Sequence, residues 1–277
     1  MSPLQKVCHH LKRYLGMVVP RFWMSNQTAY NAKEVVEYFA MQTDLQKPEQ
    51  TILKLLTENI RNGRMLDIGV GAGRTTYHFA PLVQEYIGID YSERMIETCQ
   101  RKFHPVPPNI CFKVCDAKAM GIFKDGYFDL VLASFNCIDY MCHSERIKTL
   151  REIRRTCKRG GLVCFSSHNL QCDDLFKIKG SRNPLKLLLA IYRHAWLLAL
   201  NRFTKQLASK DYATINDGAH NFRLKTYYIK PTKQIEQLKE LGFRDIRMFS
   251  LDGNELAGGS EAGSLKDCWL YYLSTAV

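Results

Sequence analysis

Several common signals are missing from this 277-residue sequence, and each absence excludes a class of protein. The ten cysteines form no CxxC pair, so a zinc cage is not indicated and no metal site is predicted. The N-terminus has no sustained apolar core with a small-residue cleavage site, so no secretion signal is expected. No internal repeat or low-complexity tract is present. These absences favour a cytoplasmic protein with reduced thiols.

A transmembrane segment is also missing. The densest apolar stretch lies in residues 184–209, but Lys186, Arg193 and His194 interrupt it and it is shorter than a bilayer span. Apolar residues make up 46% of the chain, which is enough for a substantial core. The length suffices for one large α/β domain with an appended lid.

A glycine-rich turn follows the first apolar strand. Gly69, Gly71 and Gly73 alternate there, and a helix is expected to open near Arg74. Glycine allows a sharp turn and lets a ligand lie against the backbone, while the first N–H groups of the helix face that ligand. The spacing differs from the dinucleotide pattern G-x-G-x-x-G, and Asp67 would repel a pyrophosphate. The turn therefore predicts a nucleoside-type cofactor at the end of a central strand.

Acidic side chains end two further strands. Asp90 ends the second apolar strand and is followed by Ser92, a good N-cap for a helix over 93–102. Asp116 ends the third. An acid at the position of Asp90 can accept both ribose hydroxyls of a nucleoside. These acids strengthen the prediction that the glycine turn makes.

Helices separate five apolar strands, and this pattern predicts a doubly wound parallel sheet. The five strands are expected over residues 65–69, 86–91, 110–116, 128–134 and 160–168. A helix over 231–241 and two strands over 243–251 and 268–274 follow them.

The pattern Asp67-x-Gly-x-Gly-x-Gly73, with acids at successive strand ends, resembles class I S-adenosylmethionine-dependent methyltransferases. Segments 166–169 and 227–231 resemble bacterial small-molecule members of that family. The resemblance covers most of residues 30–277. It implies a Rossmann-like, mostly parallel seven-stranded sheet of order 3-2-1-4-5-7-6. It also implies S-adenosylmethionine as cofactor and S-adenosylhomocysteine as product.

The resemblance assigns roles to individual residues of this chain. It implies that Asp90 holds the ribose hydroxyls, that Asp116 lies beside the adenine, and that the end of the fourth strand faces the sulfonium and the methyl acceptor. The residues expected to contact the cofactor are Asp67, Gly69, Gly71, Gly73, Arg74, Asp90, Tyr91, Met95, Asp116, Ala117, Ser134 and Phe135.

Two additions to the core are expected. Residues 1–60 are predicted to form an N-terminal arm and lid helices, over 30–41 and 48–60, ahead of the cofactor-binding domain in residues 61–277. Residues 170–230 are predicted to form a helical substrate lid after the fifth strand, because they are too many for a bare loop.

The insertion is strongly basic. From 177 to 230 it holds eleven Lys or Arg and two acids, a net charge of +9, and the whole chain has +12. Such a field suits an anionic small acceptor, an RNA backbone or an acidic membrane surface, although a solvated lid explains it as well. RNA is the less favoured partner, because no OB, KH, RRM or zinc module is present. Peripheral membrane contact stays open, and the oligomeric state is not predicted.

Methyl transfer needs a nucleophile placed in line with the activated methyl group and protected from water. His168 is the best candidate for a general base, because its ordinary pKa is near neutral. Asp139 would orient that base or hold a protonated amine, and Asn136 and Tyr140 are expected on the acceptor side. The sequence therefore predicts methylation of a nitrogen or oxygen atom of a small molecule, either anionic or partly hydrophobic. An RNA methyltransferase and a membrane-associated module that binds S-adenosylmethionine are the alternatives.

Overall fold

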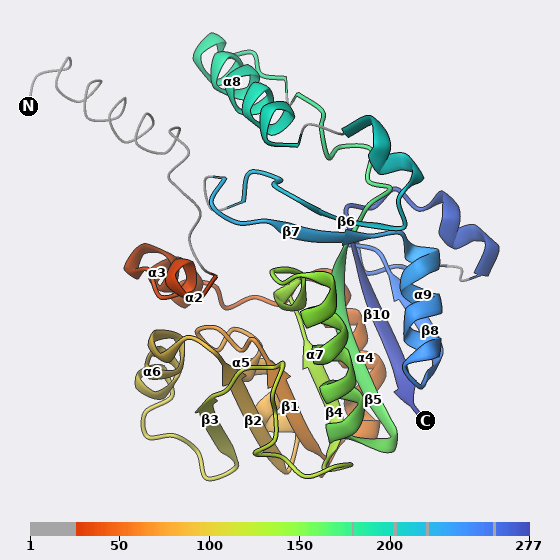
Figure 1. The fold of residues 1–277 in the computed structure, drawn as a ribbon. Coiled ribbons are helices and arrows are strands. Elements are labelled where there is room, and N and C mark those ends of the chain that lie inside the picture. Colours follow the sequence, from red (N-terminus) through yellow and green to blue (C-terminus); the bar gives the residue numbers. More distant parts are fainter. Residues whose placement is uncertain (1–25, 179, 202–203, 220–221, 257–258) are drawn as a thin grey trace, which may run out of the picture.

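A ten-stranded sheet forms the centre of the computed structural model, which describes residues 26–178, 180–201, 204–219, 222–256 and 259–277 (Figure 1). Eight strands follow one another in the order β3-β2-β1-β4-β5-β10-β8-β9. Their bounds are β1 Arg64–Ile68, β2 Glu85–Asp90, β3 Ile110–Val114, β4 Phe128–Ala133, β5 Cys157–Asn169, β8 Phe243–Phe249, β9 Glu255–Leu256 and β10 Trp269–Ala276.

The first five strands are parallel to one another, whereas β10 runs antiparallel to both β5 and β8. With β10 as the seventh strand and β8 as the sixth, the predicted order 3-2-1-4-5-7-6 is confirmed. The predicted count of seven is too low. The short β9 adds to the far edge, and the insertion contributes β6 (Tyr212–Ile215) and β7 (Thr226–Ile229). β6 pairs with β7, and β7 pairs with the end of β5.

Helices cover both faces of the sheet, as the sequence predicts. On one face α4 (Lys47–Ile60), α5 (Thr76–Phe79) and α6 (Glu93–Lys102) pack through residues such as Ile52, Phe79 and Ile96. On the other, α7 (His143–Thr156) and α9 (Pro231–Glu240) pack through Ile153 and Leu238. The Ser92 side chain accepts a hydrogen bond from the Met95 N–H, which confirms the predicted N-cap of α6.

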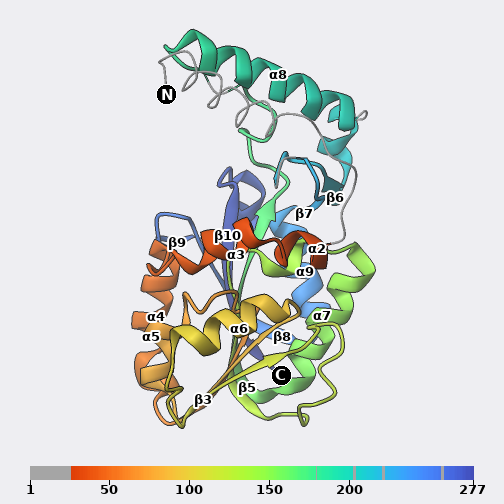
Figure 2. The same ribbon diagram turned by 90° about the vertical axis from the view of Figure 1, so that its left-hand side faces the viewer.

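The N-terminal helices divide into two roles. Helices α2 (Asn26–Tyr30) and α3 (Lys33–Ala40) cross the carboxyl end of the sheet, above α6 (Figure 2). Helix α4 is part of the core rather than a lid, because Ile52, Leu56 and Ile60 recur on one face and are buried. The arm predicted over residues 1–25 lies outside the described residues.

The insertion after β5 contains α8 (Pro184–Leu200) as well as the β6–β7 hairpin (Figure 2). Among the described residues, no helix is both long and apolar enough to cross a bilayer. A disulfide joins Cys172, at the start of the insertion, to Cys268, just before β10. The prediction of wholly reduced thiols is therefore wrong for this pair, which the fold brings together across 96 positions of sequence. The cytoplasmic location stays a prediction.

Candidate active site

A cavity of about 930 Å³ opens at the carboxyl ends of β1, β2, β3 and β4, beneath α2 and α3. This volume is at the upper end of the range typical of small-molecule and cofactor sites. The predicted residues that line it are Asp67, Gly69, Gly71, Arg74, Asp90, Tyr91, Met95, Asp116, Ala117, Ser134, Phe135 and Tyr140. Four predicted residues do not line it: Gly73, Asn136, Asp139 and His168.

The glycine turn has the conformation that the alternating pattern predicts. Gly69, Gly71 and Gly73 all have positive φ, a region that other residues rarely adopt. A Cβ on Gly73 would lie 2.6 Å from Cε2 of Phe103, so this glycine shapes the turn from behind the cavity. The helix expected near Arg74 begins two residues later, and it is a single turn, Thr76–Phe79. The backbone of the turn, rather than a long helix, therefore faces the cavity.

Asp67 is fully buried beneath this turn. Its Oδ2 accepts hydrogen bonds from the Thr75 hydroxyl and, at 2.5 Å, from the Tyr86 hydroxyl. Burial raises the pKa of Asp67 to about 6, and these two donors act against that rise. Asp67 thus ties β1, β2 and the turn together at the base of the cavity.

Asp90 lies at the tip of β2 with only 8% of its surface exposed. Its Oδ2 accepts from the Gly71 N–H at 3.1 Å and its Oδ1 from the Ser92 N–H at 2.9 Å. Burial raises its pKa to about 6, while these backbone donors lower it. A carboxylate has about four acceptor sites, so Asp90 can still accept from the two hydroxyls of a ribose. The site therefore fits a nucleoside at the position the sequence indicates.

Asp116 lies just beyond β3, where the chain turns. Its Oδ1 accepts from the Lys118 N–H at 2.9 Å, and its Oδ2 lies 3.6 Å from Lys118 Nζ. The same ammonium donates to Glu145 Oε1 at 2.9 Å. All three side chains line the cavity, so Lys118 and Glu145 join the site although sequence reasoning did not select them.

Arg74 has a partner that the sequence did not reveal. Its guanidinium makes two bonds to Glu49 of α4, at 2.5 Å and 2.7 Å, and Glu49 is only 1% exposed. The Ser134 hydroxyl also donates to Glu49 Oε1, and the Tyr271 hydroxyl donates to that same atom at 3.1 Å. The Arg74 guanidinium lies 5.2 Å from the Phe135 ring centroid. Arg74 therefore enters the cavity as half of an ion pair, held in place by α4.

Aromatic side chains form the roof of the cavity. Tyr30 of α2 lies with its ring centroid 5.7 Å from that of Tyr140 and 6.1 Å from that of Tyr91, both in edge-to-face geometry. Phe39 of α3 lies 6.2 Å from Phe135. The electron-rich faces of such rings attract cations, including a sulfonium. Helices α2 and α3 therefore supply an apolar, π-rich surface opposite the acids.

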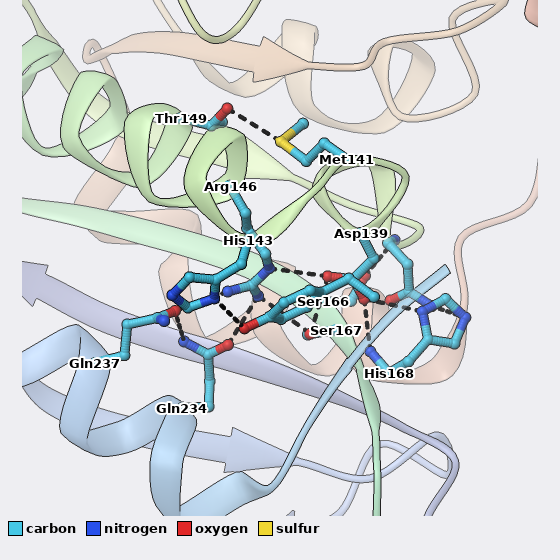
Figure 3. A network of polar contacts seen from close by, with 12 residues as sticks. Asp139, Met141, His143, Arg146, Thr149, Ser166, Ser167, His168, Gln234 and Gln237 are labelled. Carbon is cyan, nitrogen blue, oxygen red and sulfur yellow. Dashed lines mark hydrogen bonds and ion pairs between the residues drawn. The ribbon is translucent and has the colours of Figure 1, made fainter. Parts of the chain in front are cut away.

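His168 belongs to a buried polar network behind the cavity (Figure 3). Asp139 accepts from Arg146 Nε at 3.1 Å, and Arg146 is itself fully buried. Asp139 also accepts from the Ser167 hydroxyl at 3.0 Å and from the His168 N–H at 2.7 Å. With these donors and the imidazole Nδ1, all the acceptor positions of the Asp139 carboxylate are occupied. Asp139 is therefore placed to orient His168 and not to bind a protonated amine of the acceptor.

Both ring nitrogens of His168 have a polar partner. Asp139, paired with Arg146, can only accept, so the imidazole Nδ1 at 2.9 Å carries a proton. The other nitrogen, Nε2, lies 3.2 Å from Asn136 Nδ2, within hydrogen-bond distance. The imidazole is therefore enclosed between a carboxylate and an amide. The ring lies 6.5 Å from that of Tyr140, which faces the cavity.

Arg146 is the centre of this network, and sequence reasoning did not select it. Besides Asp139, its guanidinium donates at 2.8 Å to Gln237 and at 2.8 Å to Gln234, both from α9 (Figure 3). Its Cζ lies 4.8 Å from the Tyr227 ring centroid. The sequence did hold a sign of this buried arginine. Arg146 lies on the same helix face as the apolar Leu150 and Ile153, which places a basic residue on the buried side of an amphipathic helix.

The cavity has more acidic than basic side chains. Five acids and two bases line it, and each base is paired with an acid. None of the lining residues comes from the insertion over 170–230. Among the described residues, the basic side chains of the insertion therefore do not line this cavity.

Comparisons with known proteins agree with this geometry. Residues 65–161 match a family model described as a methyltransferase domain. The chain is 29% identical over 147 residues to "Uncharacterized methyltransferase YcgJ" of Bacillus subtilis, which covers 52% of this chain and 56% of that protein. It is 28% identical over 213 residues to a demethylmenaquinone methyltransferase of Staphylococcus saprophyticus, covering 72% and 78%. The chain spans about half the length of some of the curated relatives it matches.

A solved structure supports the fold. The crystal structure of an S-adenosylmethionine-dependent methyltransferase from Clostridium acetobutylicum superposes with a TM-score of 0.57, at 14% identity, over 91% of this chain and 98% of that one. The sheet order and the glycine turn define a Rossmann-like domain that binds a nucleoside cofactor. Residues 65–161 thus match a methyltransferase domain, and the comparisons support a class I S-adenosylmethionine-dependent methyltransferase, a family whose cofactor is S-adenosylmethionine.

Proposed function

We propose that this protein transfers the methyl group of S-adenosylmethionine to a nitrogen or oxygen atom of a small molecule that is partly hydrophobic and neutral or cationic. One observation carries this proposal: a single cavity combines acids at strand tips with an aromatic roof. The excess of acids disfavours an anionic acceptor, although the charge of the insertion had suggested one. A relative whose name specifies demethylmenaquinone also fits a partly hydrophobic acceptor.

The residues divide into cofactor and acceptor groups. Asp90 would accept the ribose hydroxyls, and Asp116 and Ala117 would contact the adenine. When bound, the cofactor supplies an activated methyl group. Tyr140, which lines the cavity, would face the acceptor, and the lid helices would exclude water from the reacting atoms.

His168 is our candidate for the general base. Its Nδ1 proton is fixed by Asp139, so Nε2 is the atom that would take a proton from the acceptor. In the structure Nε2 lies 3.2 Å from the Asn136 amide nitrogen. The role therefore requires Asn136 to turn away when the acceptor enters. Asn136 has a left-handed backbone at φ 55, directly after Phe135 at φ 56, and its Oδ1 is buried without a hydrogen-bond partner.

A labelled methyl donor tests the acceptor class. The protein would be incubated with the donor and, separately, with a pool of small metabolites and with total RNA. We expect label in low-mass products, and the Asp90→Asn variant should show little. Label in RNA with none in small molecules would contradict the proposal. Mass spectrometry and NMR of the product would decide whether nitrogen, oxygen or carbon receives the methyl group.

A further inference from the structure

Helix α8 carries an exposed apolar stripe along its whole length. The members of the stripe recur every three or four positions and so share one face of the helix. They are Pro184, Leu185, Leu188, Ile191, Tyr192, Ala195, Leu198 and Ala199, and every one is exposed. Leu188 is 64% exposed and Leu185 53%. No residue of α8 is buried, although the structure describes the whole helix.

The opposite face of α8 rests on the rest of the insertion. Arg193 lies on that face, where its Nη2 donates to the Gly218 carbonyl at 3.3 Å and its guanidinium lies 5.0 Å from the Phe222 ring centroid. Asn201, just after the helix, donates to the Asn216 carbonyl at 2.7 Å. These contacts orient α8, so the apolar stripe points away from the sheet. Figures 1 and 2 both show α8 at the end of the molecule, beyond β7.

The surroundings of the stripe are basic. From residue 175 to residue 210 the sequence holds eight Lys or Arg and no acid. Arg182, just before the helix, and Lys186, in its first turn, are exposed. An apolar stripe flanked by bases is the composition of helices that lie in the plane of an anionic bilayer.

We infer that α8 docks the protein on a membrane surface rich in anionic phospholipids, with the stripe inserted among the acyl chains and the flanking bases at the headgroups. The helix does not span the bilayer, because 17 residues reach only about 26 Å and Lys186 and Arg193 interrupt them. A second copy of this chain is the poorer occupant, because pairing two α8 helices would bring two acid-free basic segments together. This inference does not depend on the proposed acceptor.

Vesicle sedimentation tests the inference with the full chain. One set of vesicles would contain phosphatidylcholine alone, and the other phosphatidylcholine and phosphatidylglycerol in equal parts. We expect binding to the anionic vesicles only, weakened by added salt. The double variant L188E/I191E should bind at least roughly tenfold less, because it places charge where apolar surface is buried. Ile122→Glu places one glutamate on an apolar residue that is 60% exposed elsewhere on the surface, and it should bind as the unmodified protein does.

Three results would overturn the inference. The first is no binding of the unmodified protein to anionic vesicles, and the second is equal binding by L188E/I191E. The third is a dimer in analytical ultracentrifugation that L188E/I191E converts to a monomer, which would assign the stripe to a second copy. Cofactor affinity, measured without vesicles, should be unchanged in all variants. An unchanged cofactor affinity shows that the variants are folded. Because it is measured without vesicles, it also separates a failure of membrane binding from a failure of the proposed function.

Discussion

Asp90→Asn is the sharpest test of the cofactor site, because it changes the charge of one buried side chain and almost none of its volume. A ribose hydroxyl that donates to a carboxylate contributes about 1.5–3 kcal/mol. Asparagine keeps one neutral acceptor oxygen and turns the other into a donor. We therefore expect a loss of about 2–3 kcal/mol in binding of S-adenosylmethionine, which is roughly a 30- to 150-fold rise in Kd.

The same substitution should have little effect on folding. Burial raises the pKa of Asp90 to about 6, so its contribution to stability is fully present below its unfolded pKa and is lost as the pH rises through about 6. Keeping Asp90 ionised in the folded protein therefore costs about 3 kcal/mol at pH 8 for a pKa rise of this size, and asparagine removes this cost. It also sets an amide donor against the Gly71 N–H, which costs about 1–3 kcal/mol. The two effects oppose each other, so the Tm of the free protein should change little.

Isothermal titration calorimetry from pH 5 to pH 8 measures both effects on binding. In the unmodified protein the affinity should fall below about pH 6, because protonation of Asp90 competes with the ribose hydroxyls. In Asp90→Asn the affinity should be low and should vary less across that range. An unchanged Kd at pH 8, with the variant folded, would remove Asp90 from the site. Tight binding of NAD in place of S-adenosylmethionine would refute the whole assignment.

Three further predictions concern the turn, the buried network and the base. Gly73→Ala should destabilise the protein by about 2–4 kcal/mol in urea unfolding, because it adds a contact with Phe103 to an unfavourable φ. Gly160→Ala has the same sign of φ and open space around its Cβ, so it should cost less, and equal losses would contradict the packing argument. Arg146→Leu should cost about 3–5 kcal/mol in the same assay, because it leaves the buried Asp139 carboxylate without its counter-ion; adding Asp139→Asn should recover part of the loss, and no recovery would count against the pairing. His168→Gln should lower kcat about 100-fold or more with the Kd for S-adenosylmethionine unchanged, and an unaltered kcat would leave His168 a positioning residue only.

Strands and their acidic tips were readable from the sequence because they depend on local order. A continuous apolar run that ends in Asp90 fixes both a buried parallel strand and the side chain at its carboxyl end. Asp116 follows the shorter, partly exposed β3 by two residues. The three alternating glycines fix a turn for a similar reason, since positive φ is cheap only for glycine. The bounds of α6 came from a capping serine and an amphipathic run, which are also local.

The buried polar pairs around the cavity were not readable in the same way. Glu49 pairs with Arg74 across 25 positions, and Arg146 meets Gln234 across 88, so no short pattern links either pair. His168 looked like an accessible base at a strand end, but the structure encloses it between Asp139 and Asn136. Such pairings depend on which helix packs on which face of the sheet.

The sequence by itself determined the sheet, the glycine turn and the acids at the strand ends, because hydrophobic periodicity and backbone preference act within a few residues. Only the tertiary structure decided which charges neutralise one another. It also decided that no described residue of the basic insertion lines the cavity and that the apolar stripe of α8 is exposed and not packed on the core. Those outcomes depend on the packing of distant segments, where burial makes an unpaired charge or a polar group without a partner costly.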